Sequence, residues 1–281
     1  MVEQKSYGLL EGKKGLIFGA LDERSIAWRI ALACSREGGK FALSNAPVAL
    51  RFGDLDDLAE QTGSSIYPCD VTNEDEIEEL MEKVKEEYGG LDFMLHAIGM
   101  SPNIRKKQDY KELNYHWLQQ TLDISAISLH KILRYADEAG ILNDGASIVA
   151  LSYIGAQRIF SKYSDMNDAK ALLESIARNY GSRLADRGIR VNTISQAPTK
   201  TSAGGGIKGF DAMYTFAEKI APLGNPDADE CADYCVTLFS DLTRKVTMQN
   251  LYHDGGFNTA GISEDMINGL MELYADEEGD E

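Results

Sequence analysis

Residues 152–170 bring together side chains whose types and spacing suit proton-transfer chemistry. The stretch reads SYIGAQRIFSKYSDMNDAK and contains Tyr153, Tyr163 and Lys170. A neutral phenol has a pKa of about 10, so at pH 7 it donates a hydrogen bond to a developing oxyanion without carrying charge itself. If the stretch is catalytic, the spacing of each tyrosine from Lys170 should indicate which of the two hydroxyls acts in catalysis.

The segment around this stretch has a helical pattern over about 162–185. Tyr163 precedes Lys170 by seven residues, which corresponds to two helical turns. The two side chains are therefore expected on one face of a single helix.

Apolar runs alternate with amphipathic segments along nearly the whole chain, which indicates a parallel sheet covered on both sides. Strands are predicted at 13–20, 40–44, 65–71, 91–99, 146–152, 189–195 and 246–256. Helices are predicted at about 25–37, 54–61, 73–88, 113–137, 162–185, 211–220 and 227–240. We predict one doubly wound, Rossmann-like α/β domain over residues 1–281, a three-layer αβα arrangement that binds ligands beyond the carboxyl ends of its strands.

The composition narrows the range of partners. The net charge is −17 over 281 residues, and such a field repels nucleic acid and anionic membranes. No apolar run approaches the roughly 20 residues that span a bilayer, so we expect a soluble chain. Acidic side chains gather at 75–87, expected to be a solvated helix face, and in the tail 263–281, where 275–281 is expected to be disordered.

The four cysteines form no CxxC pair and are too sparse for a disulfide framework. Reduced thiols in a cytoplasmic protein are therefore expected. Cys231 and Cys235 share a helical face but have no histidine near them in the sequence, so we expect no metal site.

Three predicted strands end in residues that suit a nucleotide. Gly19 ends the first, and Ser25 and Ile26 open the next helix, where a phosphate would find unpaired N–H groups. One glycine alone is a weak signal for such a loop. Asp70 ends the third strand, where its carboxylate and the next N–H group could bind an adenine edge. The fourth ends in the small, flat run 97–99.

Taken in order, these motifs resemble those of the short-chain dehydrogenase/reductase superfamily, and within it the divergent branch of bacterial enoyl-acyl-carrier-protein reductases. The resemblance runs from about residue 8 to 262. The motifs that carry it are G-x5-S-I-A (19–27), CDV (69–71), H-x-I-G (96–99), L-S-Y-x-G-A (151–156), Y-x6-K (163–170), R-V-N-x-I-S (190–195) and H-D-G-G-F (253–257).

The tyrosine spacing distinguishes the enoyl-reductase branch from most of the superfamily. In most of the superfamily a tyrosine stands four residues before the lysine and a serine thirteen residues before that tyrosine. Here those positions hold Met166 and Tyr153. The resemblance to the enoyl reductases implies that Tyr163 carries the catalytic hydroxyl, that Tyr153 lines the site and that Lys170 binds the nicotinamide ribose.

The chemistry explains the change of spacing. A ketoreductase protonates an oxygen on the carbon that receives hydride, whereas in a 2-enoyl thioester the hydride goes to the β carbon and charge develops on the distant thioester oxygen. The resemblance thus implies reduction of the 2,3 double bond of trans-2-enoyl thioesters on acyl carrier protein, in type II fatty-acid synthesis.

The resemblance also assigns the remaining site residues, and it implies that residues 197–220 form a substrate lid. Gln196 and Ala197 depart from the alanine and glycine common in relatives, so the resemblance does not predict the backbone conformation at these two positions. The implied cofactor-binding residues are Gly19, Ala20, Ser25, Ile26, Asp70, Val71, Ala97, Ile98, Gly99, Lys170, Ala197, Pro198, Thr199 and Thr201. The implied substrate-binding residues are Tyr153, Tyr163, Met166, Ala203, Ile207 and Phe210, with Met213 as further apolar wall.

NADH is the expected cofactor, ahead of NADPH. The second predicted strand ends in Ser44, Asn45 and Ala46, without the acidic residue that often binds the ribose hydroxyls in NAD enzymes. It also lacks an adjacent cation for a 2′-phosphate, since Arg51 lies several residues further on.

The resemblance implies a homotetramer and an acidic carrier-protein partner. Because this chain is acidic too, docking needs a local basic patch near the pocket mouth. Lys208 matches a basic position of the family, and Lys200 and the run 105–107 are further candidates.

Two other functions stay open. A ketoreductase or another alcohol dehydrogenase of the superfamily is disfavoured by Met166 and Tyr153. A nucleotide-sensing protein without turnover is disfavoured by the intact pair of Tyr163 and Lys170.

Overall fold

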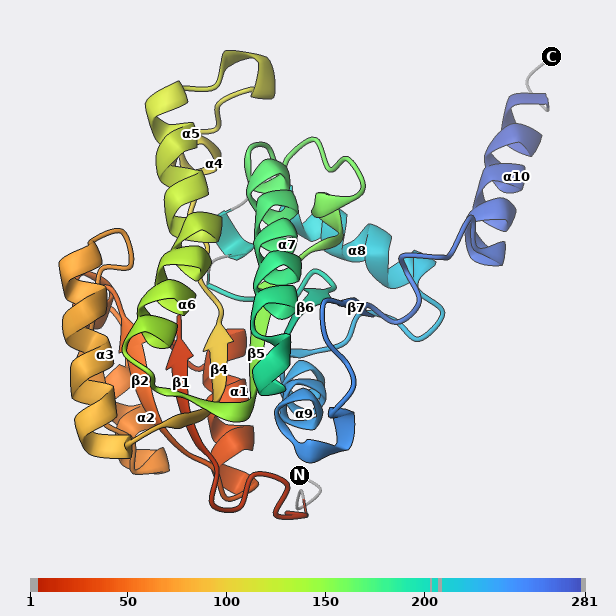
Figure 1. The fold of residues 1–281 in the computed structure, drawn as a ribbon. Helices are drawn as coiled ribbons and strands as arrows, with labels where there is room; N and C mark the ends of the chain where they lie inside the picture. The colour runs from red at the N-terminus through yellow and green to blue at the C-terminus, as the bar shows by residue number, and fades with distance from the viewer. Residues whose placement is uncertain (1–4, 203, 207–208, 279–281) are drawn as a thin grey trace.

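The computed structural model describes residues 5–202, 204–206 and 209–278. Within them seven parallel strands form one sheet in the order β3-β2-β1-β4-β5-β6-β7 (Figure 1). The strands are β1 (Lys14–Phe18), β2 (Lys40–Asn45), β3 (Ile66–Pro68), β4 (Leu91–His96), β5 (Leu142–Ser152), β6 (Arg190–Gln196) and β7 (Asn250–His253). All seven predicted strands are confirmed, and so is the doubly wound fold.

Helices cover both faces of the sheet (Figure 1). They are α1 (Ile26–Arg36), α2 (Leu55–Thr62), α3 (Glu74–Tyr88), α4 (Pro102–Arg105), α5 (Tyr115–Leu122), α6 (Ser128–Glu138), α7 (Met166–Arg183), α8 (Phe210–Ile220), α9 (Ala228–Phe239) and α10 (Glu264–Glu278). Helix α3 shows how the sequence sets their bounds. The Asn73 side chain accepts a hydrogen bond from the Asp75 N–H at 3.1 Å, and Gly89 ends the helix at a φ of 76°.

The core has two halves because successive side chains of a strand point to opposite faces of the sheet. In β1, Leu16 and Phe18 pack with α3, α6 and α7, whereas Ile17 packs with α1, α2 and α9. Most of the strand positions are buried on both faces, as expected for a parallel sheet. The apolar runs of the sequence therefore predicted the layers correctly.

The chain switches direction between β1 and β4. After β3 at one edge, it returns across the sheet to place β4 beside β1, with Phe18 paired to His96. The loops after β1 and β4 thus lead away from the sheet on opposite sides and leave a crevice between them. This is the place where a doubly wound sheet binds its ligand.

Two regions differ from the predicted elements. The predicted helix 113–137 consists of α5 and α6 with a π-helical turn, Asp123–Ile127, between them. This turn directs Ser125 to the strand end, where its hydroxyl accepts from the Met100 N–H at 3.0 Å and donates to the Met100 carbonyl at 3.2 Å. The sequence motif H-x-I-G did not predict these two hydrogen bonds between Ser125 and Met100.

The second difference lies in the acidic tail. Residues 264–278 form helix α10, which stands out from the rest of the chain (Figure 1). The expectation of disorder is wrong for 275–278, because glutamate and alanine favour helix and continue the turns begun at Glu264. Residues 279–281 lie outside the described part. Across the described residues, none of the helices combines the length and apolar character needed to cross a bilayer.

Candidate active site

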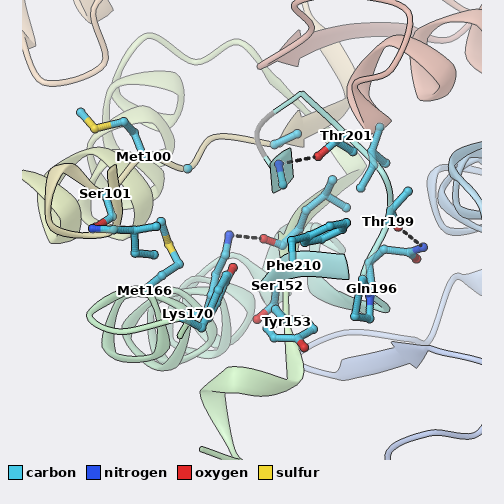
Figure 2. A pocket seen from close by; sticks show the side chains of 18 of the residues that line it. Met100, Ser101, Ser152, Tyr153, Met166, Lys170, Gln196, Thr199, Thr201 and Phe210 are labelled. Carbon is cyan, nitrogen blue, oxygen red and sulfur yellow. Dashed lines mark hydrogen bonds between the residues drawn. The ribbon is translucent and has the colours of Figure 1, made fainter. Parts of the chain in front are cut away.

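A cavity of about 270 Å³ lies at the carboxyl edge of the sheet. Side chains from α4 and α7 form one side, and the loop after β6 forms the other. Figure 2 shows Met100, Ser101 and Met166 facing Gln196, Thr199 and Thr201. Predicted site residues among its lining are Ile26, Ala97, Ile98, Gly99, Tyr153, Tyr163, Met166, Lys170, Ala197, Pro198, Thr199, Thr201, Phe210 and Met213.

The loop after β1 has the geometry that a bound phosphate requires. Gly19 has a φ of 95°, and a Cβ added there would lie 2.2 Å from the carbonyl oxygen of Ala97. Only glycine therefore fits this close approach. Helix α1 begins beyond it without a side-chain cap, because the Ser25 hydroxyl instead accepts from Leu21 N–H and donates to the Asp22 carbonyl. The helix N-terminus is thus left open to an anion.

Tyr163 is not on the helix that carries Lys170, which corrects the sequence-based expectation. Helix α7 begins at Met166, and residues 161–165 form turns in which Ser164 has a φ of 47°. A left-handed residue cannot continue a right-handed helix, so the chain redirects between Tyr163 and Met166. Tyr163 nevertheless lines the same cavity as Lys170. The two residues meet through this turn rather than through helical periodicity.

The two tyrosine rings pack against each other at the floor of the cavity. Their centroids are 4.8 Å apart at 66°, an edge-to-face arrangement. Burial raises the pKa of both Tyr163 and Tyr153, so both phenols are neutral at pH 7. The Tyr153 hydroxyl has no hydrogen-bond partner among the described residues.

The amine of Lys170 is buried at the end of β5. Its Nζ donates to the carbonyl oxygen of Leu151 at 2.7 Å (Figure 2). Burial lowers the pKa of Lys170 to about 8, with Glu174 acting in the opposite direction. A Cβ added to Gly99 would lie 3.9 Å from both Nζ and the methyl carbon of Met166. The strand end, the amine and the apolar wall therefore adjoin one another.

His96 lies below this site and stays neutral. Its Nε2 is 2.8 Å from the Ser128 hydroxyl, which donates to the Ile124 carbonyl. Burial and, to a smaller extent, the positive charge of Lys170 lower the pKa of His96 to about 3. His96 therefore adds no positive charge to the cavity.

The loop after β6 is fastened by Gln196, a residue that departs from the common family pattern. Its Oε1 lies 2.7 Å from His253 Nδ1, and its Nε2 donates to the Thr199 hydroxyl at 3.1 Å. Ala197 is not among the residues with positive φ, so it adopts this backbone without the freedom of glycine. The backbone at 196–197, which the sequence did not predict, is therefore held by the hydrogen bonds of the Gln196 side chain.

Several predicted residues lie outside the cavity lining. Gly19, Ala20 and Ser25 are beside it, in the loop after β1. Asp70 and Val71 follow β3 further along the sheet edge, and Asp70 Oδ1 accepts from both the N–H and the hydroxyl of Thr72. That oxygen already has local partners. Ala203, Ile207 and Lys208 lie outside the described residues.

The sequence reasoning missed the α4 wall of the cavity and the residue that holds it. Asp165 is fully buried and accepts from the Ser101 hydroxyl at 2.7 Å, Asn103 Nδ2 at 2.8 Å and the Thr121 hydroxyl at 2.8 Å. These donors come from the segment 101–121, which the carboxylate ties to the start of α7. The lining residues that were not predicted to bind cofactor or substrate are Met100, Ser101, Ile104, Arg105, Leu151, Ser152, Gln196 and Gly204, of which Arg105 was a candidate for docking and Gly204 belonged to the predicted lid.

The described residues contain no group of three histidine, cysteine or acidic side chains that could hold a metal ion. All four cysteines are buried, and burial raises the pKa of each thiol. The buried thiols therefore stay protonated at neutral pH in the part of the chain that the structure describes.

The glycine turn, the uncapped helix and the sheet edge define a chain of the dinucleotide-binding α/β class. A family model described as "Enoyl-(Acyl carrier protein) reductase" matches residues 19–258. This chain therefore belongs to the enoyl-(acyl carrier protein) reductase family.

Individual relatives agree. The chain is 36% identical to "Enoyl-[acyl-carrier-protein] reductase [NADH] 1" of Rhizobium meliloti (strain 1021) over 257 residues, 91% of this chain and 93% of the relative. Its structure matches the FabI–NADH complex from Alistipes finegoldii with a TM-score of 0.90 and 54% identity, covering 92% of both chains. It matches the NADH enoyl-[acyl-carrier-protein] reductase from Aquifex aeolicus VF5 with a TM-score of 0.85 and 33% identity, covering 91% of this chain and 100% of the other.

Asp165→Asn is expected to destabilise the fold by about 1–3 kcal/mol, because its amide N–H₂ group would face donors and leave buried groups unpaired. Urea denaturation measures this change. Asp168→Asn is the matched control. Asp168 lies three residues further on, and among the described residues its carboxylate accepts hydrogen bonds from the Tyr110 hydroxyl alone, at 3.0 Å and 3.3 Å. Its substitution should change stability by less than about 0.5 kcal/mol. Equal stabilities of the two variants would contradict the role given to Asp165.

Proposed function

We propose that this protein reduces the 2,3 double bond of trans-2-enoyl thioesters on acyl carrier protein, with NADH as reductant, in type II fatty-acid synthesis. One observation carries the proposal. Tyr163 and Lys170 both line the cavity, while the superfamily's usual acid position holds Met166, whose side chain forms apolar wall. The family membership and the similarity to an NADH enoyl-[acyl-carrier-protein] reductase support the same reaction.

The residues present fit a dinucleotide. The closely approached Gly19 and the uncapped start of α1 suit the pyrophosphate, and the small residues Ala97 and Gly99 leave room along the strand end. Lys170 would hold the nicotinamide ribose, and Thr199 and Thr201 the carboxamide and pyrophosphate. When bound, NADH supplies the hydride that the β carbon receives.

The cofactor choice rests on the end of β2. Asn45 Nδ2 donates to the Ala20 carbonyl at 2.8 Å and so joins the two strand ends near the expected ribose site. No acidic side chain ends this strand, and the nearest following cation is Arg51. A relative named as an NADH enzyme and a FabI–NADH complex favour NADH. A higher kcat/KM with NADPH on the same substrate would contradict this choice.

The chain's own residues stabilise charge that develops on the thioester oxygen. Tyr163 donates a hydrogen bond to that oxygen, and it does so as a neutral phenol because burial raises its pKa. Lys170 brings positive charge close to the same enolate. Met166, Phe210 and Met213 line the cavity with apolar surface that suits an acyl chain.

The segment 197–220 acts as the substrate lid in this proposal. The Ser202 hydroxyl donates to the Asp22 carboxylate in the loop after β1, so the segment reaches from the end of β6 to the far side of the crevice. Gly204 and Phe210 follow, and both line the cavity. Breaking this tie by Ser202→Ala should raise KM for the cofactor, measurable by steady-state kinetics.

We propose that the protein is a cytoplasmic homotetramer, which rests on the family resemblance and on the reduced, buried cysteines. Large apolar side chains exposed on α10, such as Met271 at 64%, give surface for contacts between copies. Light scattering of the purified chain tests this assembly through its mass.

A ketoreductase is the second candidate within the superfamily. Its acid would have to stand at position 166, where the methionine has no proton to give. Reduction of acetoacetyl thioester but not crotonyl thioester would favour it.

Tyr163→Phe should lower kcat on crotonyl thioester by about 10²- to 10³-fold while leaving NADH affinity nearly unchanged, because one oxyanion donor is lost. The rate is followed as NADH absorbance under chemistry-limited conditions. Tyr153→Phe is the matched control in the same ring pair and should cost less. Equal rates for wild type and Tyr163→Phe would remove Tyr163 from the proposed role.

For the carrier protein, the docking surface that we propose is the basic run Arg105, Lys106 and Lys107. All three side chains are exposed and form no ion pair among the described residues, and the first of them, Arg105, lines the cavity. Lys200 is the weaker candidate because its amine lies 4.4 Å from the ring centroid of Tyr214. An acidic carrier would find at this run one local attraction on a chain of net charge −17.

Reversing two of these charges in Lys106→Glu/Lys107→Glu should raise KM for enoyl carrier protein roughly tenfold at low salt. The effect should shrink at 0.15 M salt, where the Debye length falls to ~8 Å from ~30 Å at 0.01 M. KM for crotonyl-pantetheine should stay unchanged, since it has no protein surface to dock.

The matched control is Arg244→Glu/Lys245→Glu, which makes the same charge change. These two residues precede the amino end of β7, whereas the run 105–107 follows the carboxyl end of β4. An equal rise in KM for that variant would mean that net charge, and not this surface, governs docking.

A further inference from the structure

Helix α7 carries a second buried charge that the reaction outlined above does not use. Glu174 is 4% exposed and follows Lys170 by four residues, so both side chains lie on the same face of the helix. A carboxylate is seldom buried to this extent unless it has hydrogen-bond donors and a nearby cation.

Glu174 and Lys170 hold two consecutive residues of β5. The Ser152 hydroxyl donates to Glu174 Oε1 at 2.7 Å, and Lys170 Nζ donates to the carbonyl oxygen of Leu151 at 2.7 Å. Gln157, in the loop beyond β5, donates to the other oxygen, Oε2. The next residue after this doubly held strand end is Tyr153, whose ring packs against Tyr163. The position of both phenols therefore depends on the contact between β5 and α7.

We propose that Glu174 is a positioning residue for the reaction: its buried negative charge keeps the Lys170 amine protonated, and its hydrogen bonds fix the end of β5. This inference rests on the proposed function for the importance of Lys170 but makes a separate claim about its charge.

The balance of charges explains why such a partner is needed. Burial alone favours the neutral amine, and the pKa of Lys170 is already lowered to about 8. Glu174 opposes this change, so removal of its charge should lower the pKa of Lys170 further. Burial raises the pKa of Glu174 above its usual value, and the hydrogen bonds from Ser152 and Gln157 and the nearby cations offset only part of this rise. The other titratable groups near the pair are neutral His96 from β4, the neutral phenols Tyr153 and Tyr163, and the exposed Arg178 on α7.

Glu174→Gln tests the charge with little change in shape, because the amide keeps one acceptor oxygen. The protonation of Lys170 is measured without cofactor, as the pH dependence of its modification by an amine-acylating reagent, followed by peptide mass spectrometry. The midpoint should be near pH 8 in the wild type and about one unit lower in Glu174→Gln.

Ser152→Ala is the matched control, because it removes a hydrogen bond to the carboxylate but leaves the negative charge. Its midpoint should stay close to that of the wild type. A midpoint unchanged in Glu174→Gln, or lowered equally in both variants, would overturn the proposal.

Binding of NADH gives a second readout. NADH affinity should fall at high pH as Lys170 loses its proton, and this fall should begin about one pH unit lower in Glu174→Gln. In Lys170→Arg and Lys170→Arg/Glu174→Gln the fall should be absent, since a guanidinium stays protonated. If the wild type binds no NADH at any pH, the proposed function fails, whereas the midpoint of Lys170 still decides the role of Glu174.

If Glu174→Gln does not fold, the reciprocal variant Lys170→Met tests the same coupling. Two groups that interact shift each other's protonation by the same free energy. Infrared titration of the buried carboxyl should then show Glu174 protonated at a higher pH than in the wild type. An unchanged carboxyl titration would overturn the proposal.

Discussion

The site depends on one interaction, the hydrogen bond from the buried Lys170 amine to the carbonyl oxygen of Leu151. It joins helix α7 to strand β5 and sets a positive charge against an apolar cavity. An amine in such surroundings loses much of its hydration, and its pKa falls to about 8. The surrounding residues therefore have to keep this amine both fixed and charged.

The fold meets the first requirement through the parallel sheet. Strand pairing aligns the ends of β1, β4, β5 and β6, and the switch between β1 and β4 opens a crevice at that edge. The loops that leave it are held by specific groups: Ser125 holds the loop after β4, Asp165 the α4 segment and Gln196 the loop after β6. These ties preorganise the cavity before any ligand binds, which is how fixed donors gain their effect on a developing charge.

Much of this arrangement was predictable from the sequence because it follows from periodicity. Alternating apolar runs and amphipathic segments predicted every strand and the two-sided core, and the spacing of Tyr163, Met166 and Lys170 singled out the stretch that lines the cavity. The predicted shared helix was wrong, however. The left-handed φ of Ser164 keeps helix α7 from starting as early as Tyr163, and a serine in a polar stretch gives no sequence pattern that predicts such a φ. The buried carboxylates Asp165 and Glu174 were not predicted for a related reason. A sequence pattern places acidic residues on the surface, and only tertiary contacts provide the hydrogen-bond donors that allow these two to be buried.

In the proposed reaction, the cavity directs hydride to the β carbon of an enoyl thioester while Tyr163 stabilises charge on the distant thioester oxygen. The most direct measurement uses crotonyl thioester with NADH deuterated at both C4 positions, followed by NMR and mass analysis of the product. We expect butyryl thioester with one deuterium at C3 and a solvent proton at C2. The proposed reaction would be contradicted if no deuterated butyryl product formed and deuterium were instead transferred to the C3 ketone carbon of acetoacetyl thioester.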